Sequence, residues 1–238
     1  MSILSEQILN ELIKLGDSDR ARHSQRFFKT GQGEYGEGDI FLGIKVPVQR
    51  ALAKRYKKAT RKDALELLTS SYHEARLSAL FLMVGIYTRS DPQGKKQIYE
   101  DYLANVKYVN NWDLVDSSAM QIVGDYLFDK DRSHLKVLAR SSDLWERRIA
   151  VIASYHFIRQ YEFQDTLEIA EMLLGDDQDL IHKAVGWMLR EVGNRSRPTE
   201  EKFLRLHYRV MPRTMLRYAI EKFPEQLRQG YLKGEIKA

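Results

Sequence analysis

The sequence predicts an all-α fold built from a continuous array of helix pairs. Apolar residues recur at helical spacing along most of the chain, strand-like alternation is absent, and the breaks between candidate helices are short and polar. Alanines that begin apolar stripes lie at Ala79, Ala119, Ala150, Ala184 and Ala219, so the period is between 31 and 40 residues. Such periods are typical of HEAT-like repeat α-solenoids, which bind partners on a concave side. A plain helical bundle is the alternative.

The N-terminal elements are predicted from their caps and stops. A first helix runs from Ser2 or Ser5 to Leu15, since Gly16 is a natural stop. Asp17 or Ser18 would cap a second helix through position 29, and four glycines mark 30–39 as a loop. Pro47 suits the first turn of a third helix, which continues to position 56. Further helices are expected at 62–70, 73–89, 93–106, 111–129, 133–140, 144–160, 164–174, 179–192, 199–210, 212–223 and 224–233.

Length and composition favour one repeat domain over residues 1–238. The chain is long enough to bury a full core, and 43% of its residues are apolar. It has no cysteine, which excludes disulfides, thiolate metal sites and a cysteine nucleophile. The first residues lack a signal-peptide pattern, and no apolar run approaches the roughly 20 residues of a membrane helix. We therefore expect a soluble cytoplasmic protein that contacts no membrane.

The positive charge is concentrated in one segment. The formal net charge is +5, and positions 45–62 hold eight basic residues and no acidic one. A run of one sign suggests an anionic partner, although a basic solubilising face is the alternative. These residues are Lys45, Arg50, Lys54, Arg55, Lys57, Lys58, Arg61 and Lys62.

Three segments carry candidate functional side chains. Trp112 and Asp116 are four residues apart in a predicted helix and so share a face. Arg148 follows 36 residues after Trp112, and Trp187 follows 39 residues after Arg148, which is about one repeat in each case. Structural readings stay open: the tryptophans could be core residues, as we expect for Trp145, and Asp116 could be a surface carboxylate or an ion-pair partner of Arg148.

Familiar catalytic motifs are absent. The six histidines show no metal-ligand spacing, and neither a P-loop nor a G-x-S-x-G motif occurs. Residues 31–36 spell G-x-G-x-x-G, but a predicted helix precedes them where a dinucleotide site needs a strand. No metal or cofactor is therefore expected, and any catalysis must use carboxylates, arginines and aromatic residues.

Four segments, taken together, resemble the AlkD-type DNA alkylation repair glycosylases. They are FLGIKVPVQR at 41–50, WDLVD at 112–116, WERRIA at 145–150 and KAVGWMLRE at 183–191. The resemblance runs from about residue 27 to residue 223. It implies a HEAT-like solenoid with a concave basic groove for duplex DNA. It also implies hydrolysis of the N-glycosidic bond of cationic N3- or N7-alkylated purines, the first step of base excision repair.

The resemblance also implies roles for individual residues. Asp116 would be the catalytic carboxylate, Trp112 and Trp187 the cleft tryptophans, and Arg148 the cleft arginine. The glycine-rich segment 31–39 is longer than is typical of the family, and a phenylalanine stands where a tyrosine is usual. The expected DNA-binding residues are Phe27, Lys45, Arg50, Lys54, Arg55, Arg147 and Arg190.

This chemistry fits the residues present. A cationic alkylpurine leaves as a neutral base and needs no general acid, while the sugar becomes an oxocarbenium-like cation that a carboxylate stabilises. We expect a monomer that acts on double-stranded DNA containing alkylated bases. A non-catalytic DNA-binding HEAT protein and a HEAT-like scaffold for an acidic protein partner are the alternatives.

Overall fold

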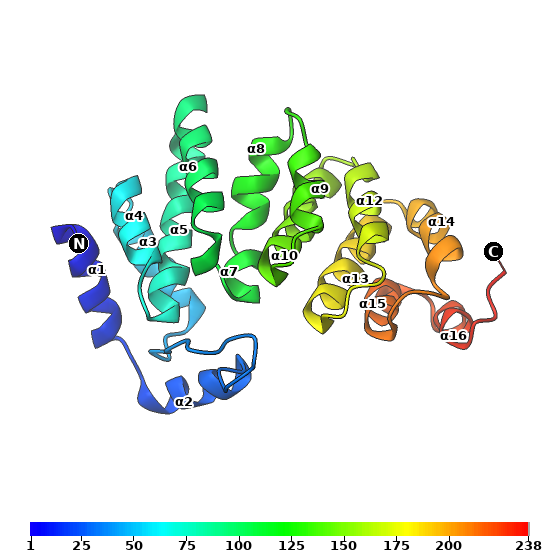
Figure 1. Cartoon of the computed structure of the whole chain (residues 1–238), viewed down its shortest axis with the longest axis horizontal. Coiled ribbons are helices and arrows are strands. Elements are labelled where there is room, and N and C mark those ends of the chain that lie inside the picture. The colour runs from blue at the N-terminus through cyan, green and yellow to red at the C-terminus, as the bar shows by residue number, and fades with distance from the viewer. Residues whose placement is uncertain (238) are drawn as a thin grey trace. The chain divides into compact units, whose positions relative to one another are not determined.

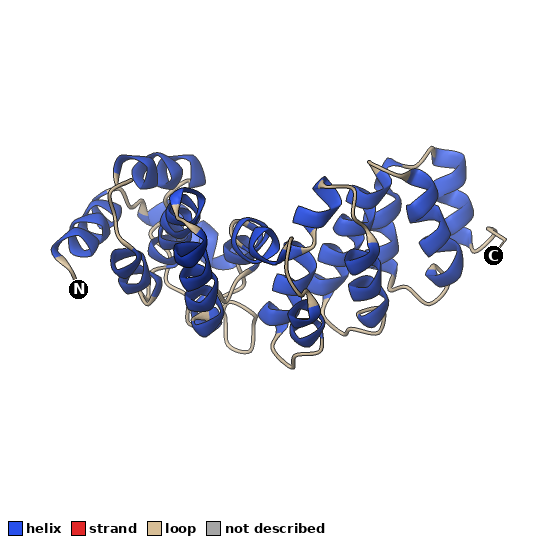
Figure 2. Ribbon diagram, turned by 90° about the horizontal axis from the view of Figure 1, so that it is seen from above, coloured by secondary structure: helices blue, strands red, loops and turns tan. Residues whose placement is uncertain are grey.

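The computed structural model describes residues 1–237 and contains helices but no strand in that range (Figures 1 and 2). The only pairing of extended backbone among these residues is one isolated bridge between Ile40 and Tyr72. The predicted all-α class is confirmed, and the fold is of the α-solenoid type. No helix within the described residues is both long and apolar enough to span a membrane.

The chain divides into two compact units, of which the first is Met1–Ser118 and the second begins at Ala119. The expectation of one domain over 1–238 stays a prediction. The first unit contains α1 (Ile3–Lys14), α2 (Ser18–Phe27), α3 (Val46–Arg55), α4 (Arg61–Leu68), α5 (His73–Arg89), α6 (Pro92–Ala104), the 3-10 turn η1 (Val106–Tyr108) and α7 (Trp112–Asp116).

Helix α5 is the centre of the first unit. It packs against α1, α3, α4, α6 and α7. Every residue from His73 to Leu80 is buried, so the helix has no solvent-facing stripe along its first two turns. The predicted span 73–89 is confirmed at both ends.

Side-chain caps explain where several helices of the first unit begin. Ser2 accepts a hydrogen bond from the Ser5 amide at the start of α1, and Asp17 caps α2 through the Asp19 and Arg20 amides. Thr60 and Asp63 form a reciprocal capping box at α4. The caps predicted at Ser2 and at Asp17 are therefore confirmed.

A buried carboxylate anchors the loop that leads into α3. Glu74 of α5 accepts hydrogen bonds from the amides of Leu42, Gly43 and Ile44, at distances of 2.8, 2.7 and 3.2 Å. Gly43 has φ +79°, and a Cβ there would lie 2.3 Å from the Asp17 carbonyl oxygen. The loop therefore runs directly against the start of α2, which places α2 and the residues after it.

The second unit is also built around one central helix. Helix α13 is its centre and packs against α10, α11, α12, α14 and α15. The elements are the π-helical turn η2 (Met120–Gly124), α8 (Asp125–Leu127), α9 (Ser133–Ala139), α10 (Leu144–Ala153), α11 (Tyr155–Arg159), α12 (Gln164–Met172), α13 (Asp179–Gly193), α14 (Arg197–His207), α15 (Arg213–Ala219), η3 (Ile220–Lys222) and α16 (Glu225–Lys233).

Two predicted long helices are wrong in their continuity. The helix expected at 111–129 is interrupted, because α7 ends at Asp116 and a turn follows. The helix expected at 144–160 is split after Ala153. Both breaks lie at fully buried serines whose hydroxyls donate to a backbone carbonyl, Ser118 to Leu114 at 2.6 Å and Ser154 to Val151 at 2.7 Å. Such bonds compete with the helix backbone and favour a bend.

Candidate functional site

Trp112 is the first residue of α7 and packs against two other aromatic rings. Asn111, which is fully buried, caps the helix by accepting the Trp112 amide at 2.8 Å. Phe28 stacks on the Trp112 ring at a centroid distance of 5.3 Å and an interplanar angle of 15°. Phe27 meets the same ring edge-on at 6.1 Å and is itself 59% exposed. Trp112 is half-buried, so part of its surface stays open beside an exposed aromatic ring.

Asp116 lies one turn after Trp112 on α7 and is half-buried. Its charge acts on the hydroxyl of Tyr102, a fully buried residue that also hydrogen-bonds Ser118 at 3.0 Å. Burial, and to a smaller extent the Asp116 charge, raises the pKa of Tyr102 far above its usual value. Tyr102 therefore stays a neutral hydroxyl beside the proposed catalytic carboxylate.

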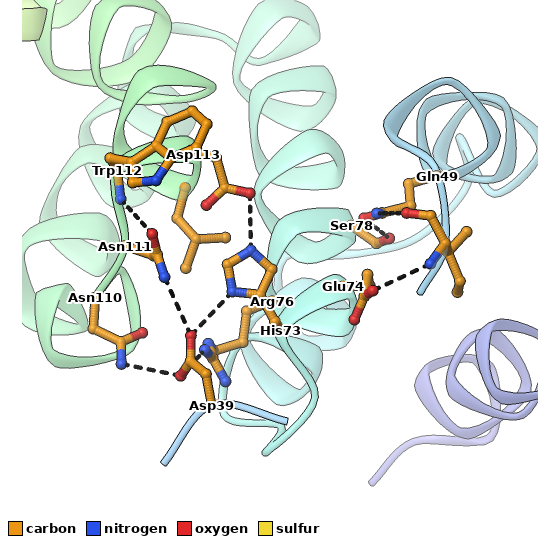
Figure 3. Close-up of polar contacts among 12 residues, drawn as sticks. Asp39, Gln49, His73, Glu74, Arg76, Ser78, Asn110, Asn111, Trp112 and Asp113 are labelled. Carbon is orange, nitrogen blue, oxygen red and sulfur yellow. Dashed lines mark hydrogen bonds and ion pairs between the residues drawn. The ribbon is translucent and has the colours of Figure 1, made fainter. Parts of the chain in front are cut away.

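A charged network lies beneath the start of α7 (Figure 3). His73 bridges Asp39 and Asp113, with Nδ1 3.1 Å from Asp39 Oδ2 and Nε2 2.8 Å from Asp113 Oδ2. Arg76 donates from Nη2 to Asp39 Oδ1 at 2.6 Å. Sequence reasoning missed these residues, because no spacing along the chain connects positions 39, 73 and 113.

Trp187 of α13 is oriented by its own polar neighbours. Its indole Nε1–H donates to Glu191 Oε1 at 3.3 Å, and the ring of Tyr155 lies 6.0 Å away. Glu191 also accepts from Arg195 Nη1 at 2.9 Å. Burial alone would raise the pKa of Glu191, but the hydrogen bonds from Arg195 and Trp187 hold it below its usual value. The acceptor for the indole is therefore a carboxylate at neutral pH.

The neighbouring arginines Arg147 and Arg148 have different surroundings. Arg148 of α10 is only 4% exposed and donates from Nη1 to the Leu180 carbonyl. Arg147 pairs with Asp176 through Nε at 2.6 Å, and its Nη1 donates to the carbonyls of Ser141 and Ser142 at 2.9 and 3.0 Å. Arg147 thus stabilises the turn between α9 and α10.

Arg76 does the same in the first unit. Its Nη1 donates to the carbonyls of Ser70 and Ser71 at 3.0 and 3.3 Å, in the turn between α4 and α5. The spacing Ser-Ser followed by Arg is identical at 70–76 and 141–147. The role of Arg147 is therefore a property of the repeat.

The basic segment 45–62 separates into paired and unpaired cations. Arg55 forms an ion pair with Glu11, and Arg61 pairs with Asp101 at 2.8 Å. Arg50 lies over the ring of Phe81 at 4.2 Å. The remaining lysines are exposed and form no ion pair with any described residue except Lys62, which is 4.0 Å from Glu66. The lysines without an ion pair are Lys45, Lys54, Lys57 and Lys58.

The other predicted site residues divide between the units. Phe27, Trp112 and Asp116 belong to the first unit, where Phe27 and Trp112 are in contact. Arg148, Trp187 and Arg190 belong to the second, and Arg190 forms an ion pair with Glu221. Trp145 is buried at 8% exposure, so the prediction that it is a core residue is confirmed.

Neither a metal nor a dinucleotide site is evident. Among residues 1–237, no group of three or more His, Asp or Glu side chains could hold a metal ion. The G-x-G-x-x-G segment follows α2 and leads into irregular backbone, so it lacks the strand and helix that would make it a dinucleotide site.

Comparison with known proteins gives the family. The family model described as DNA alkylation repair enzyme matches residues 8–223. A solved structure described as a predicted DNA alkylation repair enzyme from Enterococcus faecalis superposes with a TM-score of 0.68 over 88% of this chain and 97% of that chain, at 15% identity. That likeness shows a shared fold, and a search of curated proteins finds no match. Because the family model spans nearly the whole chain, this protein belongs to the DNA alkylation repair enzyme family.

Proposed function

We propose that this chain is a monofunctional DNA glycosylase that hydrolyses the N-glycosidic bond of cationic N3- or N7-alkylated purines in duplex DNA. The observation that carries the proposal is the pairing of Trp112 with Asp116 on one turn of α7, in a chain of the alkylation repair family. Trp112 is partly exposed, and Asp116 follows it by one helical turn, which places both side chains on one face of α7.

The reaction needs stabilisation of positive charge more than it needs an acid. As the C1′–N bond breaks, its electron pair goes to the cationic purine, which leaves neutral, and positive charge develops on the sugar. Asp116 would stabilise that charge and accept a proton from the water that attacks C1′. The products are the free alkylated base and an abasic site.

Each tryptophan has the chemistry to bind a positive charge. The face of an indole ring is electron-rich and attracts a cationic sugar or base. Trp112 rests on Phe28, and Trp187 is tied to Glu191, so both planes are fixed before a substrate arrives. A preoriented group loses less entropy on binding than a mobile one.

Arg148 and the exposed lysines would hold the DNA backbone. Arg148 is 4% exposed, so a phosphate must approach it closely and would meet a cation already fixed by Leu180. Lys45, the N-cap of α3, and Lys54, within α3, are exposed and have no ion-pair partner among the described residues. Such contacts set the position on DNA but read no sequence.

The test is release of free base from alkylated duplex DNA in EDTA. We expect the wild-type protein to release 3-methyladenine or 7-methylguanine, and Asp116→Asn to be roughly 100-fold slower or worse with little change in duplex affinity. Asp177→Asn is the matched control, because Asp177 is an exposed loop carboxylate.

Each outcome has a definite meaning. Duplex binding without base release would favour the non-catalytic DNA-binding alternative. Equal rates for wild type and Asp116→Asn would remove Asp116 from the mechanism. Loss of activity in EDTA that Mg²⁺ restores would contradict a metal-free reaction.

A further inference from the structure

His73 is a buried histidine whose two ring nitrogens both face carboxylates (Figure 3). The residue is 2% exposed and begins α5. A neutral imidazole has one N–H and one lone pair, so it would direct that lone pair at a carboxylate oxygen. Only the imidazolium can donate to Asp39 and to Asp113 at the same time, and the geometry therefore selects the charged ring.

The network joins three parts of the first unit. Asp39 ends the glycine-rich segment 31–39, His73 belongs to α5, and Asp113 is the second residue of α7. Besides His73, Asp39 accepts from Arg76 at 2.6 Å and more weakly from the Asn110 and Asn111 amides at 3.4 and 3.5 Å.

The charges in the network balance. The carboxylates of Asp39 and Asp113 face the cations His73 and Arg76. Glu74, the carboxylate next to His73 on α5, is held by backbone amides 42–44. Two buried anions with two buried cations avoid the cost of an uncompensated charge.

A second path connects His73 to Trp112 through stacked rings. The His73 ring lies 4.4 Å from that of Phe41 at 22°, Phe41 lies 4.9 Å from Phe28 at 22°, and Phe28 lies 5.3 Å from Trp112 at 15°. Trp112 is thus supported from below by the stack and held along the backbone through its neighbour Asp113.

We propose that His73 is a positioning residue, which fixes the plane of Trp112 by tying the glycine-rich segment to the first turn of α7. For its effect on catalysis this inference rests on the proposed glycosylase function. In this proposal, the glycine-rich segment 31–39 supplies Asp39 and packs around Phe28. Gly36 takes part in this, because a Cβ there would lie 2.5 Å from the Phe28 carbonyl oxygen.

The charge of His73 can be changed experimentally by changing the pH. Burial would lower its pKa, but the Asp113 charge and the hydrogen bonds to Asp113 and Asp39 outweigh burial and raise the pKa to about 9. The ring is charged at neutral pH, and its charge is lost as pH rises through that value.

The first test does not depend on enzyme activity. Protein labelled with 5-fluorotryptophan is studied by ¹⁹F NMR, and the resonances of Trp112, Trp145 and Trp187 are assigned with single Trp→Phe variants. We expect the Trp112 resonance of the wild type to be constant near pH 7 and to shift as pH rises through about 9. In His73→Gln, the Trp112 resonance should have a different chemical shift at pH 7 and should no longer shift as pH rises through about 9. His23→Gln, which changes an exposed histidine, should behave as wild type.

Two further measurements keep the inference decidable. If His73→Gln does not fold, Asp113→Asn weakens the hold on the imidazolium, and the step in the Trp112 resonance should move to lower pH. In single-turnover base release, we expect His73→Gln to be about ten-fold slower with duplex Kd nearly unchanged.

The outcomes separate the two proposals. A Trp112 resonance that is unchanged in folded His73→Gln, or a wild-type resonance without a step, would overturn the role of His73. Absence of base release by wild type would reject the proposed function, while the ¹⁹F result would still decide whether His73 positions Trp112.

Discussion

Lys54 and Arg55 are adjacent on α3, yet we expect them to contribute differently to DNA binding. Lys54 is exposed and forms no ion pair within residues 1–237, whereas Arg55 pairs with Glu11, which also accepts from the Tyr56 hydroxyl at 2.9 Å. Each change to alanine lowers the net charge by one, so the long-range attraction to DNA weakens equally. Only the loss of a direct phosphate contact changes the number of counterions released.

The expected difference between the two variants follows from the number of counterions that DNA binding releases. Each phosphate contact contributes about −0.9 to the slope of log K against log salt concentration. Between about 50 and 200 mM KCl, a four-fold change, one contact is worth about 3.5-fold in affinity. For Lys54→Ala, the fall in affinity caused by this increase in salt should therefore be about 3.5-fold smaller than for wild type. For Arg55→Ala, the fall should equal that of wild type.

The assay is fluorescence anisotropy with an undamaged, labelled duplex of about 25 base pairs, the length of an ordinary protein-binding site. Both variants are first checked for unchanged helical content by circular dichroism. Equal slopes for Lys54→Ala and wild type would return Lys54 to a solubilising role. A lower slope for Arg55→Ala alone would show that DNA displaces Glu11 from its ion pair.

Two further predictions concern buried charge. Burial raises the pKa of Glu200 to about 8, above its usual value of 4.5, so between these pH values the folded protein binds a proton that the unfolded chain has lost. The free energy of unfolding should fall as pH rises from 4.5 through 8, and Glu200→Gln should remove that loss in urea titrations at pH 5 and pH 8.5; an equal effect of the substitution at both pH values would contradict this. Arg147→Ala leaves the carboxylate of Asp176, a side chain that is 6% exposed, without its ion pair, and should lower the free energy of unfolding by about 3 kcal/mol in the same titrations. Because the Arg147 guanidinium is held by Asp176 and the turn carbonyls, we expect the salt slope of DNA binding not to change. A lower slope would show that Arg147 contacts DNA, as the sequence predicts.

Local signals in the sequence predicted helix starts well. Ser2, Asp17 and Pro47 act within one turn of their own positions, so each can be interpreted without knowledge of the packing. The interruptions at Ser118 and Ser154 were missed, because a serine inside an apolar stripe gives no sign of whether its hydroxyl turns toward a backbone carbonyl.

The support of the site could not be predicted from spacing. His73 and Asp113 are 40 residues apart, and their contact depends on how α5 and α7 pack. The sequence drew attention to Phe27, but packing places Phe28 flat beneath Trp112 and leaves Phe27 at its edge. Phe27 is the last residue of α2 and Phe28 is its C-cap, so which of the two phenylalanines meets Trp112 depends on how the chain leaves the helix.

Arg147 and Arg148 differ because adjacent residues on one helix, here α10, point about 100° apart. A comparison within the chain shows which of the two follows the repeat. Arg76 and Arg147 follow Ser-Ser at identical spacing and donate to the same turn carbonyls, so an arginine at this position belongs to the repeat. The next position holds Leu77 in the first unit, an apolar residue 1% exposed, and Arg148 in the second, a cation 4% exposed. Burying a cation where the repeat accepts leucine brings a desolvation cost that packing alone does not require. This departure from the repeat supports the proposal that Arg148 binds a phosphate, whereas Arg147 follows the repeat.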